Sequence, residues 1–288
     1  MIHPEKLYGI VIWYFPSKNH IDNIKSYVDN VNKLIVVDNS GENNFSLLSD
    51  YDQSKIIYIE NSLNHGVATA LNQGCKKAVE CGAEWVLTVD QDSNFQDDNL
   101  FEFIDNANQY TDFETVAIFT PIHFDSRYTN IKPVFENKYL KTNYTMTSGN
   151  LLSLNKWKEV GFFLDELFID WVDEEFCIRI CKFKLQIVQI NDILLNHFVG
   201  DGIGEVKLFK VKKHFDLYQP IRFYYITRNL FIICKLYPTE AKRLKKRWKR
   251  LVLKTLKYDN NNKFPKLMFV FRGYIDYLFG KTGAYIIK

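Results

Sequence analysis

Residues 85–92 read WVLTVDQD, an apolar β-rich run that ends in two aspartates on either side of one glutamine. Open α/β sheets bind ligands in the crevice beyond the carboxyl ends of their strands, so this stretch predicts a buried strand with a polar site at its end. Alternation along the strand would send the side chains of Asp90 and Asp92 to the same side. Two such carboxylates suit a hard divalent cation that also binds substrate phosphates. A solvated turn with helix-capping aspartates is the alternative, since such triplets are common at turns.

Similar strands are predicted on either side of this run. They cover residues 7–14, 33–37, 56–59, 116–120, 186–190 and 194–195, with a helix at 20–30. Strands that alternate with helices predict a mostly parallel sheet covered on both faces. The second strand ends on Asp38, which suits hydrogen bonding to a nucleobase or ribose or, alternatively, an ordinary Asx turn. Small residues around Asn64 and Gly66 predict a loop that enters a helix and lets a ligand approach closely.

An acidic segment, DWVDEE at residues 170–175, is predicted to open a helix. The helix macrodipole favours negative charge at this end, which accounts for any one of these carboxylates. A carboxylate close to a cation site is also what a general base needs to take a proton from a hydroxyl. Arg179 is expected to pair with Glu175 one helical turn away. His197 follows an apolar run and is either a structural histidine or a metal ligand, depending on whether the fold brings it to Asp92.

The composition predicts a packed protein with two parts of opposite charge. Of its 288 residues 47% are hydrophobic and 16% aromatic, which excludes a disordered chain. Residues 205–288 hold 21 Lys and Arg against 5 Asp and Glu, whereas residues 1–204 hold 16 against 29. We therefore expect a catalytic domain at 1–204 and a helical, basic C-terminal region at 205–288, with helices at 222–236, 240–257 and 264–280.

The second of these helices, at 240–257, combines many lysines and arginines with Trp248 at the boundary of its apolar face. This pattern favours binding to an anionic membrane surface. Nucleic acid is the competing partner for a basic face, but the acidic first part argues against it, and we expect no nucleic-acid binding. The five cysteines form no CxxC pair, and the sequence has neither a signal-peptide pattern nor a long apolar run. A cytoplasmic protein that neither enters nor crosses a membrane by itself is the expectation.

The motifs come in a characteristic order: Asp38 after a strand, Asn64-x-Gly66, Asp90-x-Asp92, Ser148-Gly149-Asn150, Asp173-Glu174-Glu175 with Arg179, and His197. Over about residues 7–235 this order resembles glycosyltransferase family 2. The stretches TVDQDS (88–93), FIDWVD (168–173) and YYxxRN (224–229) are similar to the bacterial rhamnosyltransferase subgroup of that family.

The resemblance implies a GT-A fold, a Rossmann-like nucleotide-binding sheet flanked by helices, and inversion by one in-line displacement. It implies Mg²⁺ or Mn²⁺ held by Asp92 and His197, with Asp90 touching the donor ribose or a metal-bound water. Asp173 takes the place of the catalytic base, and Asp170 and Glu174 are reserves for that role. The substrate-binding residues implied are Asp38, Asn64, Gly66, Asp90, Gln91, Asn150, Asp170, Trp171 and Glu174.

For the reaction, the resemblance favours transfer of L-rhamnose from dTDP-rhamnose to a polyprenyl-diphosphate-linked glycan. This reaction would serve capsule, O-antigen or cell-wall polysaccharide synthesis at the inner face of the cell membrane. A transferase of UDP-galactofuranose or another UDP-hexose is the alternative. A nucleotidyltransferase would need a glycine-rich basic loop after the first strand, which residues 13–17 do not provide. A non-catalytic glycan- or membrane-binding protein would have no reason to keep Asp92, Asp173 and His197 together.

Overall fold

The computed structural model of the protein describes residues 1–96, 99–127, 135–198, 200, 202–208, 211–259 and 263–286. The chain divides into two compact units. Unit 1 comprises Met1–Asp165 and Asp173–Phe198, and unit 2 comprises Glu166–Val172 and Val199–Lys288. The short segment before residue 173 thus belongs to the unit that holds the C-terminal helices. The functional division after Gly204 stays a prediction.

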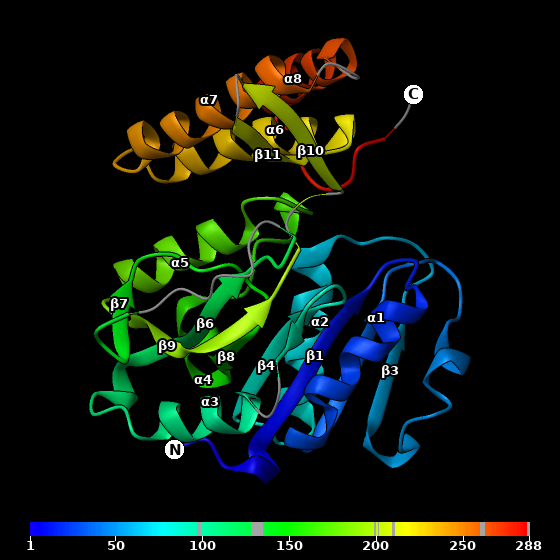
Figure 1. The fold of residues 1–288 in the computed structure, drawn as a ribbon, viewed down its shortest axis with the longest axis vertical. Helices are drawn as coiled ribbons and strands as arrows, with labels where there is room; N and C mark the ends of the chain where they lie inside the picture. The colour runs from blue at the N-terminus through cyan, green and yellow to red at the C-terminus, as the bar shows by residue number, and fades with distance from the viewer. Residues whose placement is uncertain are drawn as a thin grey trace. The chain divides into compact units, whose positions relative to one another are not determined.

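Unit 1 is built on a nine-stranded mixed sheet (Figure 1). Its strands are β1 (Leu7–Trp13), β2 (Lys33–Asp38), β3 (Ile56–Glu60), β4 (Trp85–Asp90), β5 (Asn94–Phe95), β6 (Val116–Phe124), β7 (Tyr139–Thr142), β8 (Asn150–Ser153) and β9 (Gln186–Asn196). They run in the order β3-β2-β1-β4-β8-β6-β9-β5, with β7 paired to β9. The half from β3 to β4 is parallel, as predicted. The other half is mixed because β8 enters antiparallel to both β4 and β6.

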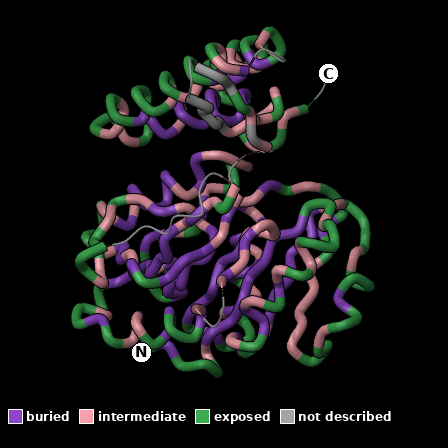
Figure 2. The backbone as a smooth tube through the Cα atoms, in the orientation of Figure 1, coloured by how far each residue is buried: buried purple, intermediate pink, exposed green. Residues whose placement is uncertain are grey.

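Helices cover both faces of this sheet. Leu7, Val11 and Trp13 of β1 share a core with Ile24 and with α3 (Asn99–Asn108) on one face. The opposite face of β1 meets α2 (Val67–Glu80), where a Cβ on Gly74 would lie 2.6 Å from the side chain of Ile10. The central strands β1, β2, β4, β8 and β6 accordingly appear as mostly buried segments in Figure 2.

Three predicted elements, one helix and two strands, differ from the observed ones. The helix expected at 20–30 is α1 (Lys18–Asn23) followed by two 3₁₀ turns, since Tyr27 leaves the helical region to place its ring in the core. The two strands expected at 186–190 and 194–195 are the single strand β9, whose pairing with β6 shifts register between them. The polar pair Asn191-Asp192 interrupts the apolar pattern but not the backbone.

Unit 2 contains α6 (Pro220–Leu236), α7 (Ala241–Tyr258) and α8 (Lys263–Leu278), close to the three predicted helices. Before them β10 (Gly202–Leu208) and β11 (Val211–Leu217) form an antiparallel hairpin that we did not predict. Its alternation of apolar and basic residues is a strand pattern, although the high charge of the region suggested helices. Unit 1 also contains α4 (Leu154–Val160) and, except for its first residue, α5 (Val172–Lys182). Among the helices in the described part of the chain, none has the length and hydropathy needed to cross a membrane.

Candidate active site

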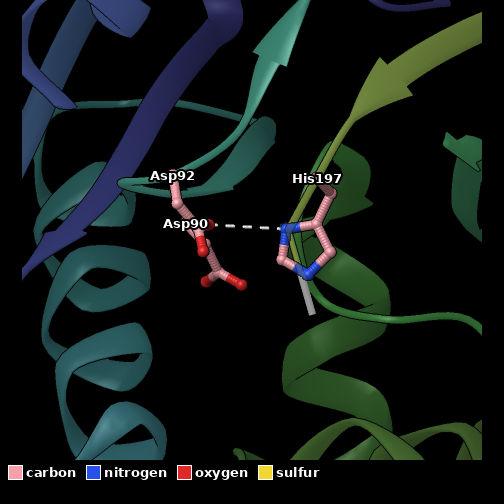
Figure 3. Close-up of side chains that lie close together, drawn as sticks. All are labelled: Asp90, Asp92 and His197. Atoms are coloured by element: carbon pink, nitrogen blue, oxygen red, sulfur yellow. Dashed lines mark ion pairs between the residues drawn. The ribbon is translucent and has the colours of Figure 1, made fainter. Parts of the chain in front are cut away.

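Asp90, Asp92 and His197 lie together at the carboxyl ends of β4 and β9 (Figure 3). Each offers one ligand atom, and these three atoms all lie within 4.8 Å of one another. His197 is buried and its Nδ1 lies 3.5 Å from Asp92 Oδ1. Residues separated by about a hundred positions therefore meet at one point, as the resemblance implied. The two carboxylates are ligands of the type that Mg²⁺ and Mn²⁺ accept, and the imidazole nitrogen adds a donor of the type that transition-metal ions prefer.

The two aspartates converge for a reason other than the predicted strand alternation. Strand β4 ends at Asp90, and a turn closed by the hydrogen bond from Ser93 N to Asp90 O carries Asp92. The side-chain amide of Gln91 fixes this turn, because its Oε1 accepts from Tyr14 N at 2.8 Å and its Nε2 donates to Tyr14 O at 3.1 Å. Gln91 thus contacts the backbone after β1 in the structure, and its predicted contact with substrate stays a prediction.

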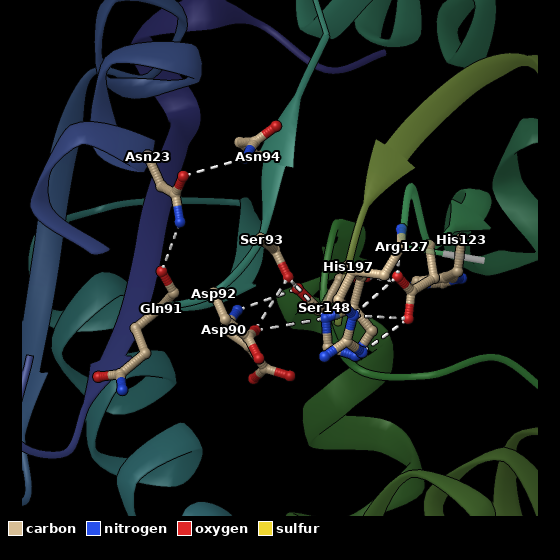
Figure 4. A network of polar contacts seen from close by, with 11 residues as sticks. Asn23, Asp90, Gln91, Asp92, Ser93, Asn94, His123, Arg127, Ser148 and His197 are labelled. Atoms are coloured by element: carbon tan, nitrogen blue, oxygen red, sulfur yellow. Dashed lines mark hydrogen bonds and ion pairs between the residues drawn. The ribbon is translucent and has the colours of Figure 1, made fainter. Parts of the chain in front are cut away.

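A chain of hydrogen bonds connects Asp90 to His197 and supports the cluster that they form with Asp92 (Figure 4). The Asp90 N–H donates to Ser148 Oγ at 3.0 Å, Ser148 Oγ lies 2.8 Å from Ser93 Oγ, and Ser93 Oγ lies 2.7 Å from His197 Nδ1. Burial of the His197 ring lowers its pKa, but the hydrogen bond with Asp92 and the negative charge of the surrounding carboxylates outweigh burial, and the pKa lies above its ordinary value. The imidazole is thereby tuned by the acidic cluster that it completes.

His123 of β6 contacts the turn at residues 145–150, which contains Ser148. Its Nε2 lies 2.7 Å from Ser148 O, and its ring meets that of His197 edge to face at 5.9 Å between centroids. Burial lowers the pKa of His123 to about 4. The ring is therefore neutral near pH 7, and its Nε2–H donates to the Ser148 carbonyl.

Asp173 and Asn150 line one small cavity together. The lining residues are Thr88, Ile118, Thr145, Thr147, Asn150, Leu152, Phe163, Asp173, Phe176 and Cys177. Tyr144 OH donates to Asp173 Oδ2 at 2.9 Å and Glu174 N to Asp173 Oδ1 at 2.8 Å, which fixes the carboxylate at the start of α5. Asn150 is buried and its Nδ2 donates to Met146 O at 2.7 Å. The turn at 145–150 thus links Asp173 to the acidic cluster, because Ser148 contacts Asp90.

Gly149 lets this turn pass close to the sheet. It has φ +78°, and a Cβ there would lie 2.6 Å from the side chain of Leu195. An L-residue would therefore be strained in backbone and in packing. The Ser-Gly-Asn motif of the sequence is explained by these contacts.

Asp38 lies at the end of β2 and is fully buried. Its Oδ1 accepts from Ser40 N at 2.9 Å, as in the Asx turn that the sequence left open. Its Oδ2 accepts from Tyr58 OH at 2.6 Å and Asn44 Nδ2 at 2.9 Å. Burial, followed by the hydrogen bond with Asp38, raises the pKa of Tyr58.

The loop with Asn64 and Gly66 lies beside this strand end. Asn64 Oδ1 accepts from Gly66 N at 2.8 Å, and Gly66, with φ +85°, is the N-cap residue that precedes α2. Asn39, next to Asp38, donates from its Nδ2 to Gly66 O at 3.1 Å. The N-terminus of a 14-residue helix therefore opens beside Asp38, and helix N-termini favour anionic groups such as phosphates.

Asp170 and Trp171 belong to unit 2, whereas Asp90, Asp92 and His197 belong to unit 1. Asp170 forms a bidentate ion pair with Arg222, at 2.8 and 2.6 Å. Trp171 is buried and its Nε1 donates to Ile226 O at 2.9 Å. Phe168, Asp170 and Trp171 all have φ between +64° and +67°, a strained conformation for residues other than glycine.

Asn229 and Arg228 of α6 hold this strained segment. Asn229 is buried, and its side-chain nitrogen lies 2.7, 2.8 and 3.1 Å from the carbonyl oxygens of Leu167, Ile169 and Asp170. Arg228 donates to Glu166 O and Leu167 O. The sequence pattern YYxxRN contained these two residues, but nothing in it indicated what they contact.

The predicted pair between Glu175 and Arg179 is confirmed. Arg179 binds both carboxylate oxygens of Glu175, at 2.7 and 2.8 Å, and also the carbonyls of Val160, Gly161 and Phe162. Glu174 is buried beside it. Sequence reasoning missed His123, Tyr144 and Arg222, which carry no local motif and become meaningful only through contacts across the fold.

Comparison with known proteins assigns the fold and the family. The family model described as "Glycosyl transferase family 2" matches residues 15–163. The dTDP-rhamnosyl transferase RfbF of Shigella flexneri is 29% identical over 248 residues, covering 80% of each chain. The hexosyltransferase Agl10 of Haloferax volcanii, named for low-salt glycan biosynthesis, is 22% identical over 63% of this chain, which spans 64% of that protein. A crystal structure of S. aureus TarS with UDP-GlcNAc has a TM-score of 0.59 at 14% identity, covering 95% of this chain and 80% of that one.

The fold is thus that of a GT-A glycosyltransferase, as the resemblance implied. More specifically, the chain belongs to glycosyltransferase family 2, in which inversion is the typical stereochemical course. The protein is therefore an enzyme, which decides against both a nucleotidyltransferase and a non-catalytic binding protein.

Proposed function

We propose that this glycosyltransferase moves L-rhamnose from dTDP-rhamnose to a hydroxyl of a lipid-linked glycan during bacterial polysaccharide synthesis, in a metal-dependent reaction at the inner face of the membrane. The meeting of Asp90, Asp92 and His197 at the strand ends carries the proposal, since a nucleotide-sugar transferase needs charge compensation where the diphosphate departs. Similarity to RfbF supports the rhamnose donor, and a UDP-hexose is the second choice.

The cluster fits a divalent cation by the chemistry of its donors. Two carboxylates and one imidazole converge, and Ser93 Oγ at 2.7 Å from Nδ1 fixes the ring as the second partner of a metal-bound histidine usually does. Asp92 and His197 would hold the ion, and Asp90 would contact it through water or contact the ribose. Once bound, such an ion neutralises negative charge on the leaving diphosphate.

Asp173 is the proposed base. In the reaction the acceptor oxygen forms a bond to the anomeric carbon, the bond from that carbon to the phosphate oxygen breaks, and its electron pair leaves with the diphosphate. Asp173 accepts the proton of the acceptor hydroxyl. Tyr144 and the Glu174 N–H orient its carboxylate at the cavity wall. Of the two reserves, Asp170 is the weaker, since the guanidinium of Arg222 stabilises its charge.

The proposed nucleotide contacts are Asp38, Asn64 and Gly66. Their support is the N-terminus of α2 beside the end of β2, a natural place for a diphosphate. Asn150, Gln91, Trp171 and Glu174 remain proposed substrate contacts. For Asn150 and Gln91 the observed bonds to backbone favour a role in shaping the site around the substrate.

Turnover of dTDP-rhamnose by the purified protein, with short lipid-linked glycans as acceptors and Mn²⁺ present, tests this proposal. We expect release of dTDP with that donor and at least tenfold less release from UDP-galactofuranose or UDP-galactose. Asp173→Asn should lower kcat by about 10²–10⁴-fold, the range for loss of a general base, with little change in donor affinity. Asp165→Asn, a carboxylate near α2, is the matched control and should retain activity. Faster turnover of a UDP-sugar, or full activity of Asp173→Asn, would contradict the proposal.

A further inference from the structure

Helix α8 of unit 2 carries its apolar residues on the outside. Its exposed residues are Phe264, Pro265, Leu267, Met268, Phe271, Tyr274 and Leu278, which are apolar or aromatic and recur at the spacing of one helical face. Phe264 is 73% exposed and Phe271 67%. Single exposed apolar residues are ordinary, but a continuous stripe of this kind marks a surface that contacts something apolar.

The buried face of α8 is correspondingly polar. Lys266 is buried and forms an ion pair with Asp259. Asp276 is buried and accepts from Tyr224 OH at 3.1 Å and from Lys281 Nζ at 2.8 Å. Turning the apolar stripe inward would break these pairs and leave charged groups buried without partners, at a large free-energy cost.

Close backbone contact also fixes the rotation of α8 about its axis. A Cβ on Gly273 would lie 2.5 Å from the carbonyl oxygen of Tyr224 on α6, so only glycine permits this approach. The inward face is therefore set by the α6–α8 contact. The apolar stripe has no alternative position within unit 2.

Helix α7 indicates which partner covers the stripe. Its exposed residues other than Leu253 are basic, namely Lys242, Arg243, Lys245, Lys246, Arg247, Lys249, Arg250, Lys254 and Lys257. So many cations complement an anionic surface, and their mutual repulsion disfavours pairing of this unit with a second copy of itself. With 16 residues, α8 suits a position in the plane of a bilayer interface and is short for a membrane span.

From these features we infer that α8 inserts its apolar face into an anionic lipid bilayer while the cations of α7 bind the headgroups. This inference replaces the sequence-based expectation that the chain does not enter a membrane by itself. The inference deepens the proposed function, because it identifies the element that docks the enzyme where a lipid-linked acceptor is found. It assigns the two contributions to different helices. Insertion by α8 is insensitive to salt, whereas attraction by α7 is screened by it.

Flotation of the full-length protein with vesicles of phosphatidylcholine containing phosphatidylglycerol tests the inference. The double variant Phe264→Glu, Phe271→Glu should lower the partition coefficient roughly tenfold or more at low and at high salt, since each phenylalanine contributes its burial. Lys245→Gln with Lys249→Gln should weaken binding several-fold at low salt and much less at high salt. Phe101→Glu is the matched control, because Phe101 is 66% exposed on α3 of unit 1, and it should bind like the wild type.

A second variant reports the depth of insertion directly. The fluorescence of Phe271→Trp, minus that of the wild type, should shift to the blue and be quenched by lipids brominated on the acyl chain. Binding of the double variant equal to that of the wild type, or an unquenched Trp at position 271, would overturn the role of α8. A third result would also overturn the role of α8 in membrane binding: the wild type is a dimer that does not bind lipid, and the double variant is a monomer. The apolar stripe would then contact a second copy of the chain.

These results are separable from the proposed function. The double variant should keep its stabilisation by dTDP and Mn²⁺, since the nucleotide contacts belong to unit 1. Loss of vesicle binding with nucleotide binding retained isolates the docking surface. Vesicle binding without any turnover of a sugar donor would contradict the proposed reaction alone.

Discussion

Two phenylalanines show how differently the two units are constructed. Phe119 of β6 is fully buried in unit 1, with ring centroids 5.3–6.0 Å apart in its aromatic cluster of Trp85, Tyr110 and Phe113. Phe271 of α8 is two-thirds exposed in unit 2, while Lys266 and Asp276 of the same helix are buried. Unit 1 thus follows the usual order of apolar inside and charged outside, and α8 reverses it.

This difference indicates which kind of partner the surface of each unit suits. In unit 1 polar side chains gather at the carboxyl ends of β2, β4 and β9, an arrangement that suits a small polar ligand held by directed contacts. In unit 2 an extended apolar stripe and a row of cations suit a broad surface with little directional detail. Our two proposals together give one chain a donor site in unit 1 and a lipid-binding surface in unit 2.

We expect the largest difference in the free energy of unfolding between alanine variants of these two phenylalanines. Phe119→Ala should lower the free energy of unfolding by about 3–5 kcal/mol, because it leaves a cavity in a packed aromatic cluster. Phe271→Ala should change it by less than about 0.5 kcal/mol in buffer, since it removes a solvated side chain. Urea denaturation of both variants measures the difference. Equal losses of stability would show that the α8 stripe is covered in solution and would break the comparison.

A smaller effect tests the strained segment of unit 2. Asn229→Ala removes the donor to three carbonyls around residues with positive φ, and we expect a loss of about 2–4 kcal/mol in unfolding free energy. Asn106→Ala is the control. It makes the same substitution on α3 of unit 1, at a residue that does not contact the strained segment. We also expect kcat to fall more than donor affinity, since the segment leads directly into Asp173. A stable and fully active Asn229→Ala enzyme would remove the segment from the account.

The smallest effect concerns pH. The folded-state pKa of His123 is lowered to about 4, below the value of about 6.5 in the unfolded chain. The unfolded state therefore binds a proton that the folded state does not, so this contribution is complete above pH 6.5 and is lost as the pH falls towards 4. With EDTA present to remove metal, we expect the free energy of unfolding to fall by on the order of 1–3 kcal/mol as the pH falls from about 6.5 to about 4. In His123→Gln the free energy of unfolding should depend less on pH over this range. The same pH dependence as in the wild type would contradict the lowered pKa of His123.

Much of the fold and site was predictable because it depends on local pattern. Apolar runs ending in Asp38 and Asp90 define parallel strands, and the order of motifs led to the family. The antiparallel entry of β8 was not predictable, since four residues carry too little signal to reveal their direction. Nor was the hairpin of β10 and β11, whose alternating pattern was obscured by the high charge of the region.

Site residues that belong to a sequence motif could be predicted. Those whose role depends on a contact across the fold could not. Asp92 and His197 were expected to meet, and they do. The catalytic role of Asp173 is still a prediction. Ser148 was noticed as part of a turn, but its position between Asp90 and Ser93 depends on a hydrogen bond across 55 residues. The contact of Gln91 with Tyr14 likewise requires β1 and β4 to be neighbours in one particular register, which no spacing in the sequence indicates.

The most direct test of the central claim is a thermal-shift experiment on the wild type and Asp92→Ala with dTDP, UDP or GDP, each in Mn²⁺ or EDTA. A ligand that binds only the folded state at a hundred times its Kd stabilises it by about 2.7 kcal/mol, which raises the Tm by several degrees. We predict such a rise for dTDP with Mn²⁺ in the wild type, and its loss in EDTA and in Asp92→Ala. An equal rise in EDTA or in Asp92→Ala, or no rise with any nucleotide, would contradict a metal-dependent donor site at Asp90, Asp92 and His197.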